Sequence, residues 1–374
     1  MADPVNKKTT VCLSMIVKNE AHVIRRCLES VIPFIDTWVI SDTGSTDGTQ
    51  DLIKDIMKDV PGELIERPWK DFGHNRQEAL AHASGKADYI FIIDADDFLE
   101  TDEGFSFQNL TEDAYHIKKV HGGHQYYVLN IVRNDIGWHW CDVLHEYLDN
   151  ENTHTIGKID DARIAVGKDG ARSRDPNTYV KDAAILSRAL KSDPNNTRYQ
   201  FYLAQSWRDA EEIGFAIKHY NKRIKMGGWS EEIFWSKYQV AILKSRRGDA
   251  WSECMAQYLD AYEHTPTRAE PLYQIGMHYQ LAEAWDMAWL FLSRASQMHA
   301  PNDSLLFVDH SVYQYRAPLE AGVAAYYLRM FEQASELNQR VIDCPKATDY
   351  YVELAQGNLQ LCADEIQKRD MKAA

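Results

Sequence analysis

The stretch VCLSMIVKNEAHVIRRCLESVIPFIDTWVIS, residues 11–41, decides the fold class of this 374-residue chain. Its first seven residues form an apolar run that predicts a buried strand, and residues 37–41 predict another. Residues 20–32 predict an amphipathic helix, whose apolar side consists of Val23, Ile24, Leu28, Val31 and Ile32. A strand, a helix and a second strand in this order favour a βαβ unit, and therefore a parallel sheet.

The same alternation continues downstream. Residues 49–60 and 74–83 predict helices. ELIERP (63–68) predicts a weaker strand, and ADYIFIIDADD (87–97) predicts a strongly apolar strand that ends in carboxylates. Residues 112–150 are β-rich, which predicts a mixed extension of the sheet. Because ligands of such sheets bind beyond the carboxyl ends of the strands, the polar segments at those ends are the first candidates for a functional site.

The character of the sequence changes at GKDGARSRDPN (167–177), whose turn-forming residues predict a loop or linker. We therefore predict an α/β domain over residues 1–166 and a helical domain over residues 178–374. The helical part carries a loose repeat, formed by Tyr199, Trp235 and Tyr273 at intervals of 36 and 38 residues, Ala261 and Ala295 34 apart, and Pro266 and Pro301 35 apart.

A period near 34, with aromatic residues early and alanine late, resembles tetratricopeptide repeats. An unrelated helical domain is the alternative. Stacks of such helical pairs bind a peptide or another subunit more often than they perform chemistry.

The composition excludes several classes of protein. With 45% hydrophobic and 26% charged residues, the chain can build a core, which excludes a disordered or low-complexity protein. Its net charge of −15 argues against a protein that binds nucleic acid. No apolar run approaches the ~18 residues of a transmembrane helix, and the start MADPVNKKTT lacks the apolar stretch of a secretory signal. Six cysteines without a CxxC motif predict thiols in a reducing compartment, so we expect a cytoplasmic protein.

The strongest chemical signal is the carboxylate cluster Asp94, Asp96 and Asp97 at the end of the apolar run IFII. If the strand continues, Asp94 and Asp96 project to the same side, which suits a hard divalent cation. A solvated strand end that leads into a helix N-cap is the alternative.

Four motifs give this cluster a context. They are LSMIVKNEAHVIRRCLESV (13–31), WVISDTGSTDGTQDLI (38–53), HNRQEAL (74–80) and ADYIFIIDADD (87–97). In this order and spacing they resemble family 2 glycosyltransferases, which implies the GT-A fold, a Rossmann-like α/β domain that binds a nucleotide-sugar. With the repeat-like helices that follow, the chain is similar to a subgroup that includes lipopolysaccharide-core-type transferases and peptide S-glycosyltransferases.

The resemblance implies roles for particular residues. The nucleotide-sugar-binding residues that it implies are Leu13, Ser14, Met15, Asn19 and Glu20 around the base and ribose, Asp42 at a uracil ring, Arg76 near the diphosphate, and Asp94 at the ribose. Asp94 and Asp96 match the DxD pair that holds Mn²⁺ or Mg²⁺, with Asp97 supporting them. The DGT segment at Asp47 is expected to cap a helix instead.

The catalytic base is expected in WHWCDVLHEYL (138–148), which resembles a His-Glu element of the subgroup. Glu146 is the first candidate base, and Asp142 is its rival. His145 is the expected metal or phosphate contact. The two tryptophans stack on the sugar or base, or else pack in the core.

Lys168, Arg172 and Arg174 form a basic loop in an acidic protein. It is either a solvated linker or a mobile loop that closes over the diphosphate. If it is a mobile loop, Arg172 and Arg174 bind the nucleotide-sugar donor.

Other histidines and cysteines do not suggest a metal by their spacing. His121 and His124 are expected to flank a hairpin turn rather than bind zinc, and Cys141 is expected to be a small packed residue.

Together with these features, the resemblance implies a metal-dependent glycosyltransferase that uses a UDP-sugar, with inversion as the expected outcome and retention as the alternative. Its acceptor is a glycan, a peptide or a small molecule, and the helical domain is either the acceptor's docking surface or a homodimer interface. A sugar nucleotidyltransferase would need a basic, glycine-rich loop where SMIVKNEAH stands. A non-catalytic adaptor with a vestigial first domain is the remaining alternative.

Overall fold

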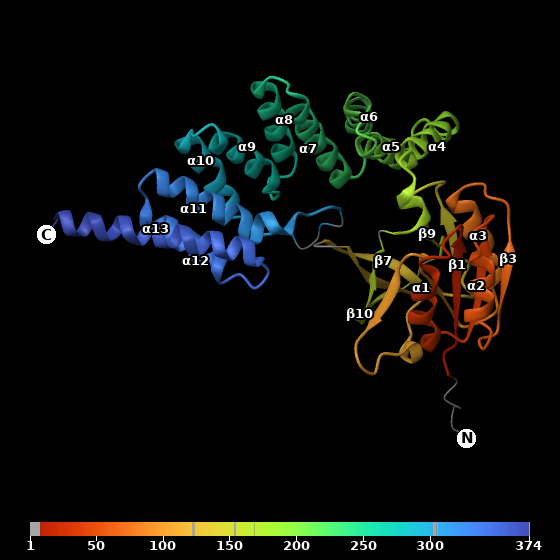
Figure 1. The fold of residues 1–374 in the computed structure, drawn as a ribbon. Helices are drawn as coiled ribbons and strands as arrows, with labels where there is room; N and C mark the ends of the chain where they lie inside the picture. The colour runs from red at the N-terminus through yellow and green to blue at the C-terminus, as the bar shows by residue number, and fades with distance from the viewer. Residues whose placement is uncertain are drawn as a thin grey trace. The chain divides into compact units, whose positions relative to one another are not determined.

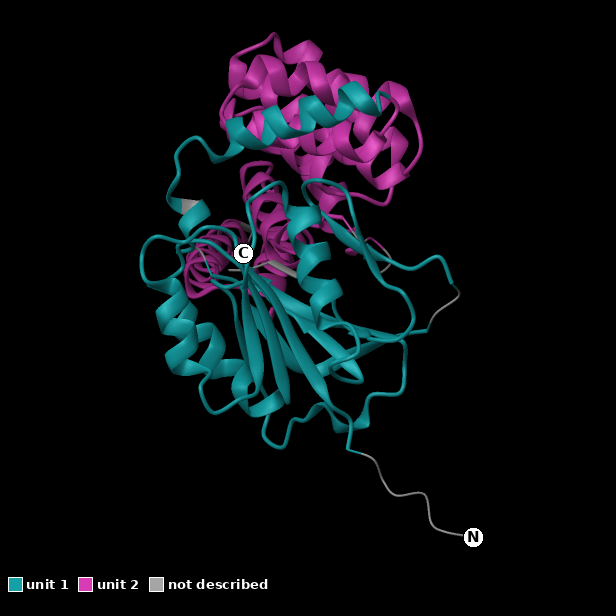
Figure 2. Cartoon of the chain, turned by 90° about the vertical axis from the view of Figure 1, so that its right-hand side faces the viewer, with its two compact units in different colours: residues 1–194 teal, residues 195–374 magenta. Residues whose placement is uncertain are grey.

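The computed structural model describes residues 8–121, 124–152, 155–167, 169–301, 304 and 306–373. They belong to two compact units, Met1–Pro194 and Asn195–Ala374 (Figure 2). The first unit includes helix α4 (Thr178–Ser192). The sequence-based prediction assigns these residues to the helical domain instead. Among the described helices, none is long and apolar enough to cross a membrane.

The first unit is built on a mixed sheet that has eight strands in the described part of the chain (Figure 1). In spatial order they are β3 (Gly62–Glu66), β2 (Thr37–Asp42), β1 (Val11–Val17), β4 (Tyr89–Ile92), β7 (His124–Arg133), β6 (Ala114–His121), β10 (Ile156–Ala165) and β5 (Phe98–Thr101). Strands β1 to β4 pair in parallel, whereas β7 is antiparallel to both of its neighbours. The predicted α/β fold with a mixed extension is confirmed.

Helices cover both faces of the sheet because its inner strands alternate two apolar faces. On β1, Leu13 and Met15 pack in the core with α1 (Ile24–Val31) and α2 (Thr49–Ile56). Cys12 belongs to the opposite core, with α3 (Phe72–Ala83). That second core also receives residues from a separate two-stranded sheet, β8 (His139–Cys141) and β9 (Tyr147–Asp149).

Short 3₁₀ helices complete the unit: η1 (Ile32–Phe34), η2 (Phe107–Asn109) and η3 (Ala171–Arg174).

The order of the strands indicates which edge of the sheet is expected to bind a ligand; we call this edge, at the carboxyl ends of β1, β2 and β4, the site edge. The chain passes from β1 to β2 on one side, and later returns to pair β4 with β1 on the other. A crevice at such a reversal point is where open α/β sheets bind ligands. The carboxyl ends of the three strands, at Val17, Asp42 and Ile92, lie at this edge.

The second unit is helical. Its helices are α5 (Thr197–Asp209), α6 (Ile213–Met226), α7 (Ser230–Arg247), α8 (Trp251–His264), α9 (Glu270–Leu281), α10 (Trp285–Ser296), the π-helical turn η4 (Val312–Arg316), α11 (Ala317–Tyr327), α12 (Phe331–Ile342) and α13 (Asp349–Ala373). From α5 to α13, each helix packs against the next in the chain, as expected for stacked helical hairpins.

The predicted repeat residues occupy corresponding places in this stack. Tyr199, Trp235 and Tyr273 lie near the starts of α5, α7 and α9, the first helices of three successive pairs. Ala261 and Ala295 lie late in α8 and α10 and are fully buried. The tetratricopeptide-like architecture is therefore confirmed.

Gly276 in α9 shows how closely one pair approaches. A Cβ atom there would lie 2.5 Å from Leu292 Cγ of α10, so only glycine fits without a shift. We expect Gly276→Ala to lower the free energy of unfolding by about 1–3 kcal/mol through overpacking, measured by urea denaturation.

Gly357 in α13 is the matched control, since a Cβ atom there meets nothing within 4 Å. Gly357→Ala should instead stabilise by about 0.5–1 kcal/mol through helix propensity. Equal effects of the two substitutions would contradict the close α9–α10 approach.

Candidate functional site

Arg76 joins three segments at the site edge of the sheet. It lies on α3, which Asp71 caps by accepting a hydrogen bond from the His74 N–H at 2.8 Å. Arg76 Nη2 donates to Asp94 Oδ1 at 2.5 Å, and Nε donates to Glu146 Oε1 at 2.5 Å. The predicted DxD segment and the predicted base are thus held by one buried guanidinium, although they are far apart in the sequence.

A second cation completes the arrangement. Lys119 of β6 donates to Asp94 Oδ2 at 3.1 Å and to Asp97 Oδ2 at 2.9 Å. Burial disfavours the charged form of Asp94, but Arg76 and Lys119 outweigh it and hold its pKa well below the ordinary range. For Asp97, burial dominates and raises the pKa to about 6 despite Lys119. Both oxygens of Asp94 are therefore engaged within the chain.

Asp96 has a different environment. Its carboxylate forms no ion pair with any residue that the structure describes. Burial, followed by the charge of Asp94, raises its pKa. A Cβ atom on Gly170 would lie 2.4 Å from Asp96 Oδ2, so the backbone after β10 packs directly on this side chain. Asp96 is thus the one carboxylate of the cluster Asp94, Asp96 and Asp97 that has no ion pair with a described residue.

The segment after β10 is held against the site by hydrogen bonds. The Gly167 N–H donates to Asp97 Oδ1 at 3.1 Å, and the Ala171 N–H donates to the Glu20 carboxylate at 3.1 Å. Burial raises the pKa of Glu20 to about 7, against the lowering effect of the Ala171 N–H. The loop after β1, which is predicted to bind the nucleobase and ribose, therefore contacts the positively charged loop of residues 167–177.

The two arginines of that loop are placed differently. Arg172 pairs with Asp182 of α4 and lies 4.8 Å over the ring of Phe72 at the start of α3. Arg174 is exposed. Lys168 and the side chains of His121 and His124 lie outside the described residues. The role of Arg172 and Arg174 in donor binding stays a prediction.

Asp42 sits at the end of β2 with one oxygen satisfied. Its Oδ1 accepts from the Gly44 N–H, the Ser45 N–H and Gln50 Nε2, each at 2.9 Å. Burial works against ionisation, but these hydrogen bonds prevail and lower its pKa. Its Oδ2 is buried and finds no hydrogen-bond partner among the described residues. Such an oxygen lacks the hydrogen bond that most buried polar atoms make.

The neighbouring loops are locked together. Asn19 adopts a positive φ of 59°, and its side chain accepts from the Thr46 N–H at 2.8 Å. Asp47 accepts from the Thr49 N–H and from the Ala21 N–H, so it ties the start of α2 to the loop after β1. The N-cap residue itself is Gly48, one position after Asp47.

Among the predicted base-binding residues, Leu13 and Met15 have core side chains, exposed by 0% and 1%. Only their backbone can face a ligand. Ser14 and Met15 do line one small cavity together with Arg76 and Trp140.

The loop between β8 and β9 carries the remaining predicted residues. Asp142 and His145 both adopt positive φ values, 72° and 54°. The Asp142 carbonyl packs on Gly73, where a Cβ atom would lie 2.0 Å from it. His145 is exposed. Asp94, Asp96 and His145 are not gathered into a metal-ligand group within the described ranges, so their role as ligands stays a prediction.

Sequence reasoning missed Lys119 and the packing of residues 167–171. The signal for Lys119 was present: in AYHIKKV, adjacent lysines interrupt an apolar strand, and alternation turns one of them inward.

Comparison with known proteins fits this arrangement. The Glycosyl transferase family 2 model matches residues 12–116. Residues of the chain are 39% identical over 90 positions to a TPR repeat-containing protein of Synechococcus elongatus, covering 24% of this chain and 21% of that protein. They are 36% identical over 88 positions to the SPbeta prophage-derived glycosyltransferase SunS of Bacillus subtilis, covering 23% and 20%. The matches span only about a fifth of these relatives.

Among solved structures, S. aureus TarS 1-349 aligns over 68% of this chain and 91% of its own, with 14% identity and a TM-score of 0.37.

The double contact of Lys119 predicts a large stability effect. Lys119→Met leaves Asp94 and the buried Asp97 without this cation, which should lower the free energy of unfolding by about 3–5 kcal/mol in urea denaturation. Lys118→Met is the matched control, because Lys118 lies over the Tyr127 ring instead and should cost less than about 1 kcal/mol. Equal losses would contradict the buried contact.

Glu20 predicts a pH dependence. Its pKa is raised from about 4.5 to about 7 on folding, so the folded protein binds this proton more tightly than the unfolded chain. Its contribution to stability is therefore present below pH 4.5 and lost as pH rises to 7, on the order of 1 kcal/mol for a half-buried group. Urea midpoints at pH 5 and 7.5 should show a smaller decline in Glu20→Gln than in wild type. Exposed Glu29, as Glu29→Gln, should keep the full decline; an unchanged decline in Glu20→Gln would refute the assignment.

Proposed function

We propose that this chain, whose residues 12–116 form a family 2 glycosyltransferase domain, transfers a sugar from a UDP-sugar to a glycan or peptide acceptor. The observation that carries the proposal is the junction at Arg76, which brings the DxD carboxylate Asp94 and Glu146 to one point. That point lies at the carboxyl edge of β1, β2 and β4, where an α/β sheet binds a nucleotide.

Asp42 supports uridine as the nucleoside. Its buried Oδ2, unpartnered within the described part of the chain, suits a ring N–H donor, and uracil has one at N3. Its Oδ1 is fixed by Gly44, Ser45 and Gln50, so the carboxylate is already oriented, and a movement of the groups that cover Oδ2 would admit the base.

The acidic cluster fits a divalent cation, Mn²⁺ or Mg²⁺. Asp96 is the first ligand that we assign, because its carboxylate forms no ion pair with any described residue and lies in the same cluster as Asp94 and Asp97. Asp94 and His145 are the other predicted ligands. Both carboxylate oxygens of Asp94 already accept hydrogen bonds, one from Arg76 and one from Lys119. When bound, such an ion supplies positive charge that stabilises the leaving diphosphate.

Glu146 is the proposed base. Its side chain is 10% exposed, and Arg76 fixes it beside the DxD pair. In an inverting displacement, the acceptor's nucleophile loses its proton to this carboxylate as it attacks the anomeric carbon from the face opposite the diphosphate. Arg76 would contact the diphosphate from the same position.

The acceptor is proposed to engage the helical unit, because tetratricopeptide-like stacks bind peptides and other proteins on extended surfaces. A homodimer through this unit remains the second role that we propose for it.

Asp96→Ala tests the donor site. With UDP in hundredfold excess over its dissociation constant, Mn²⁺ present, wild type should gain about 2.7 kcal/mol of apparent stability in a thermal-shift assay. Asp96→Ala should lose the metal-dependent part of this gain. Asp135→Ala, at an exposed carboxylate, should retain it. No UDP effect in wild type would favour the adaptor reading.

Glu146→Gln tests the base. We expect transfer to fall by at least 10²-fold while UDP still raises the melting temperature, since the amide cannot accept the proton. Asp142→Asn should retain most of the transfer rate. The reverse result, measured with the same donor, would assign the base to Asp142.

A further inference from the structure

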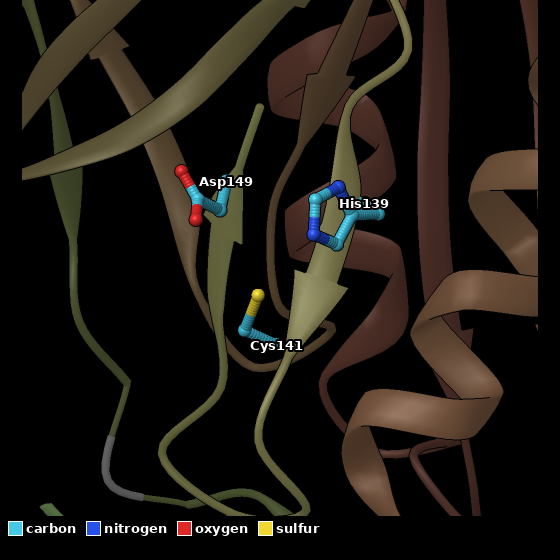
Figure 3. A group of neighbouring side chains, drawn as sticks. All are labelled: His139, Cys141 and Asp149. Atoms are coloured by element: carbon cyan, nitrogen blue, oxygen red, sulfur yellow. The ribbon is translucent and has the colours of Figure 1, made fainter. Parts of the chain in front are cut away.

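Three potential metal ligands share one face of the two-stranded sheet formed by β8 and β9. His139 pairs with Asp149 across the strands, and Cys141 lies two residues along β8 from His139. Because side chains alternate between the faces of a strand, all three project to the same side. Figure 3 shows them together, two from β8 and one from β9.

Their ligand atoms lie close enough to share an ion. One nitrogen of His139, the Cys141 sulfur and one Asp149 oxygen all lie within 4.8 Å of one another. Ligands at about 2.0–2.3 Å from a tetrahedral zinc ion are roughly 3.3–3.8 Å apart, so small side-chain rotations would close the group.

The chemistry of the group differs from that of the acidic cluster. A thiolate and an imidazole prefer Zn²⁺, whereas an all-oxygen set prefers Mg²⁺ or Mn²⁺. His139 and Cys141 are half-buried and Asp149 is exposed, which leaves a fourth position open to water.

We propose that His139, Cys141 and Asp149 form a zinc site separate from the donor site. Binding releases a proton from the Cys141 thiol and requires the neutral form of His139. Among the described residues, no other group of three such side chains comes as close together.

The site would link the two strands of the β8–β9 hairpin, in addition to the packing of its tryptophans in the second core. Each of its strands has only three residues, and short two-stranded sheets are marginal in water. The connecting loop carries the positive φ values of Asp142 and His145, and it ends at Glu146, the partner of Arg76. An ion bound by residues of both strands would therefore restrain the loop that ends at Glu146, and so restrain Glu146 itself.

The test is a titration of the full chain with Co²⁺, followed by competition with Zn²⁺. We expect one equivalent of Co²⁺ with a thiolate-to-cobalt charge-transfer band, removed by Zn²⁺. Cys141→Ser should abolish the band, and Asp149→Asn should weaken binding at least tenfold.

Cys344→Ser is the matched control, because Cys344 is also partly exposed and lies in the helical unit. It should leave the band unchanged. Zinc should also slow amide hydrogen exchange over residues 142–149 in wild type, but not in Cys141→Ser. No thiolate band in wild type, or an equal band in Cys141→Ser, would overturn the proposal. Neither readout uses a nucleotide, so this outcome is independent of sugar transfer.

Discussion

The geometry of the site depends on one buried guanidinium. Arg76 is 13% exposed, and it holds Asp94 from the end of β4 and Glu146 from the β8–β9 loop. A buried arginine is costly unless charged partners surround it, so these carboxylates stabilise the cation and the cation orders them. Helix α3 thereby connects the parallel sheet with the small hairpin that packs on its second face.

The remaining charges follow from that contact. Arg76 and Lys119 hold the pKa of Asp94 low, whereas burial raises the pKa values of Asp96, Asp97 and Glu20 beside it. These carboxylates lie together at the carboxyl edge of the sheet, where a bound cation would offset their charge. The second, softer donor set on β8 and β9 lies in a different electrostatic setting, with one carboxylate, one imidazole and one thiol.

Local patterns in the sequence were sufficient to predict β1, β2, α3 and the polar segments at the strand ends. Each of these depends on neighbouring residues: apolar runs, helical periodicity and carboxylates after a strand. Strand β5 and strand β10 were not predicted, because β5 has few residues and joins the sheet through antiparallel pairing with β10, about sixty positions away. The role of Lys119 depends on the position of β6 beside β7 and β10, and the His139–Cys141–Asp149 group depends on hairpin register. Neither position nor register is encoded in spacing along the chain.

The packing of Gly167 and Gly170 on Asp96 has a consequence for exchanging modules between proteins of this kind. The backbone that leaves the sheet contributes to the candidate site, through the Gly167 and Ala171 amides, before it reaches α4. Arg172 then pairs with Asp182 inside α4. A chimera joined at residue 166 would remove part of the site along with the repeats. A functional junction for grafting foreign repeats onto this domain lies beyond Ser192, where α4 ends.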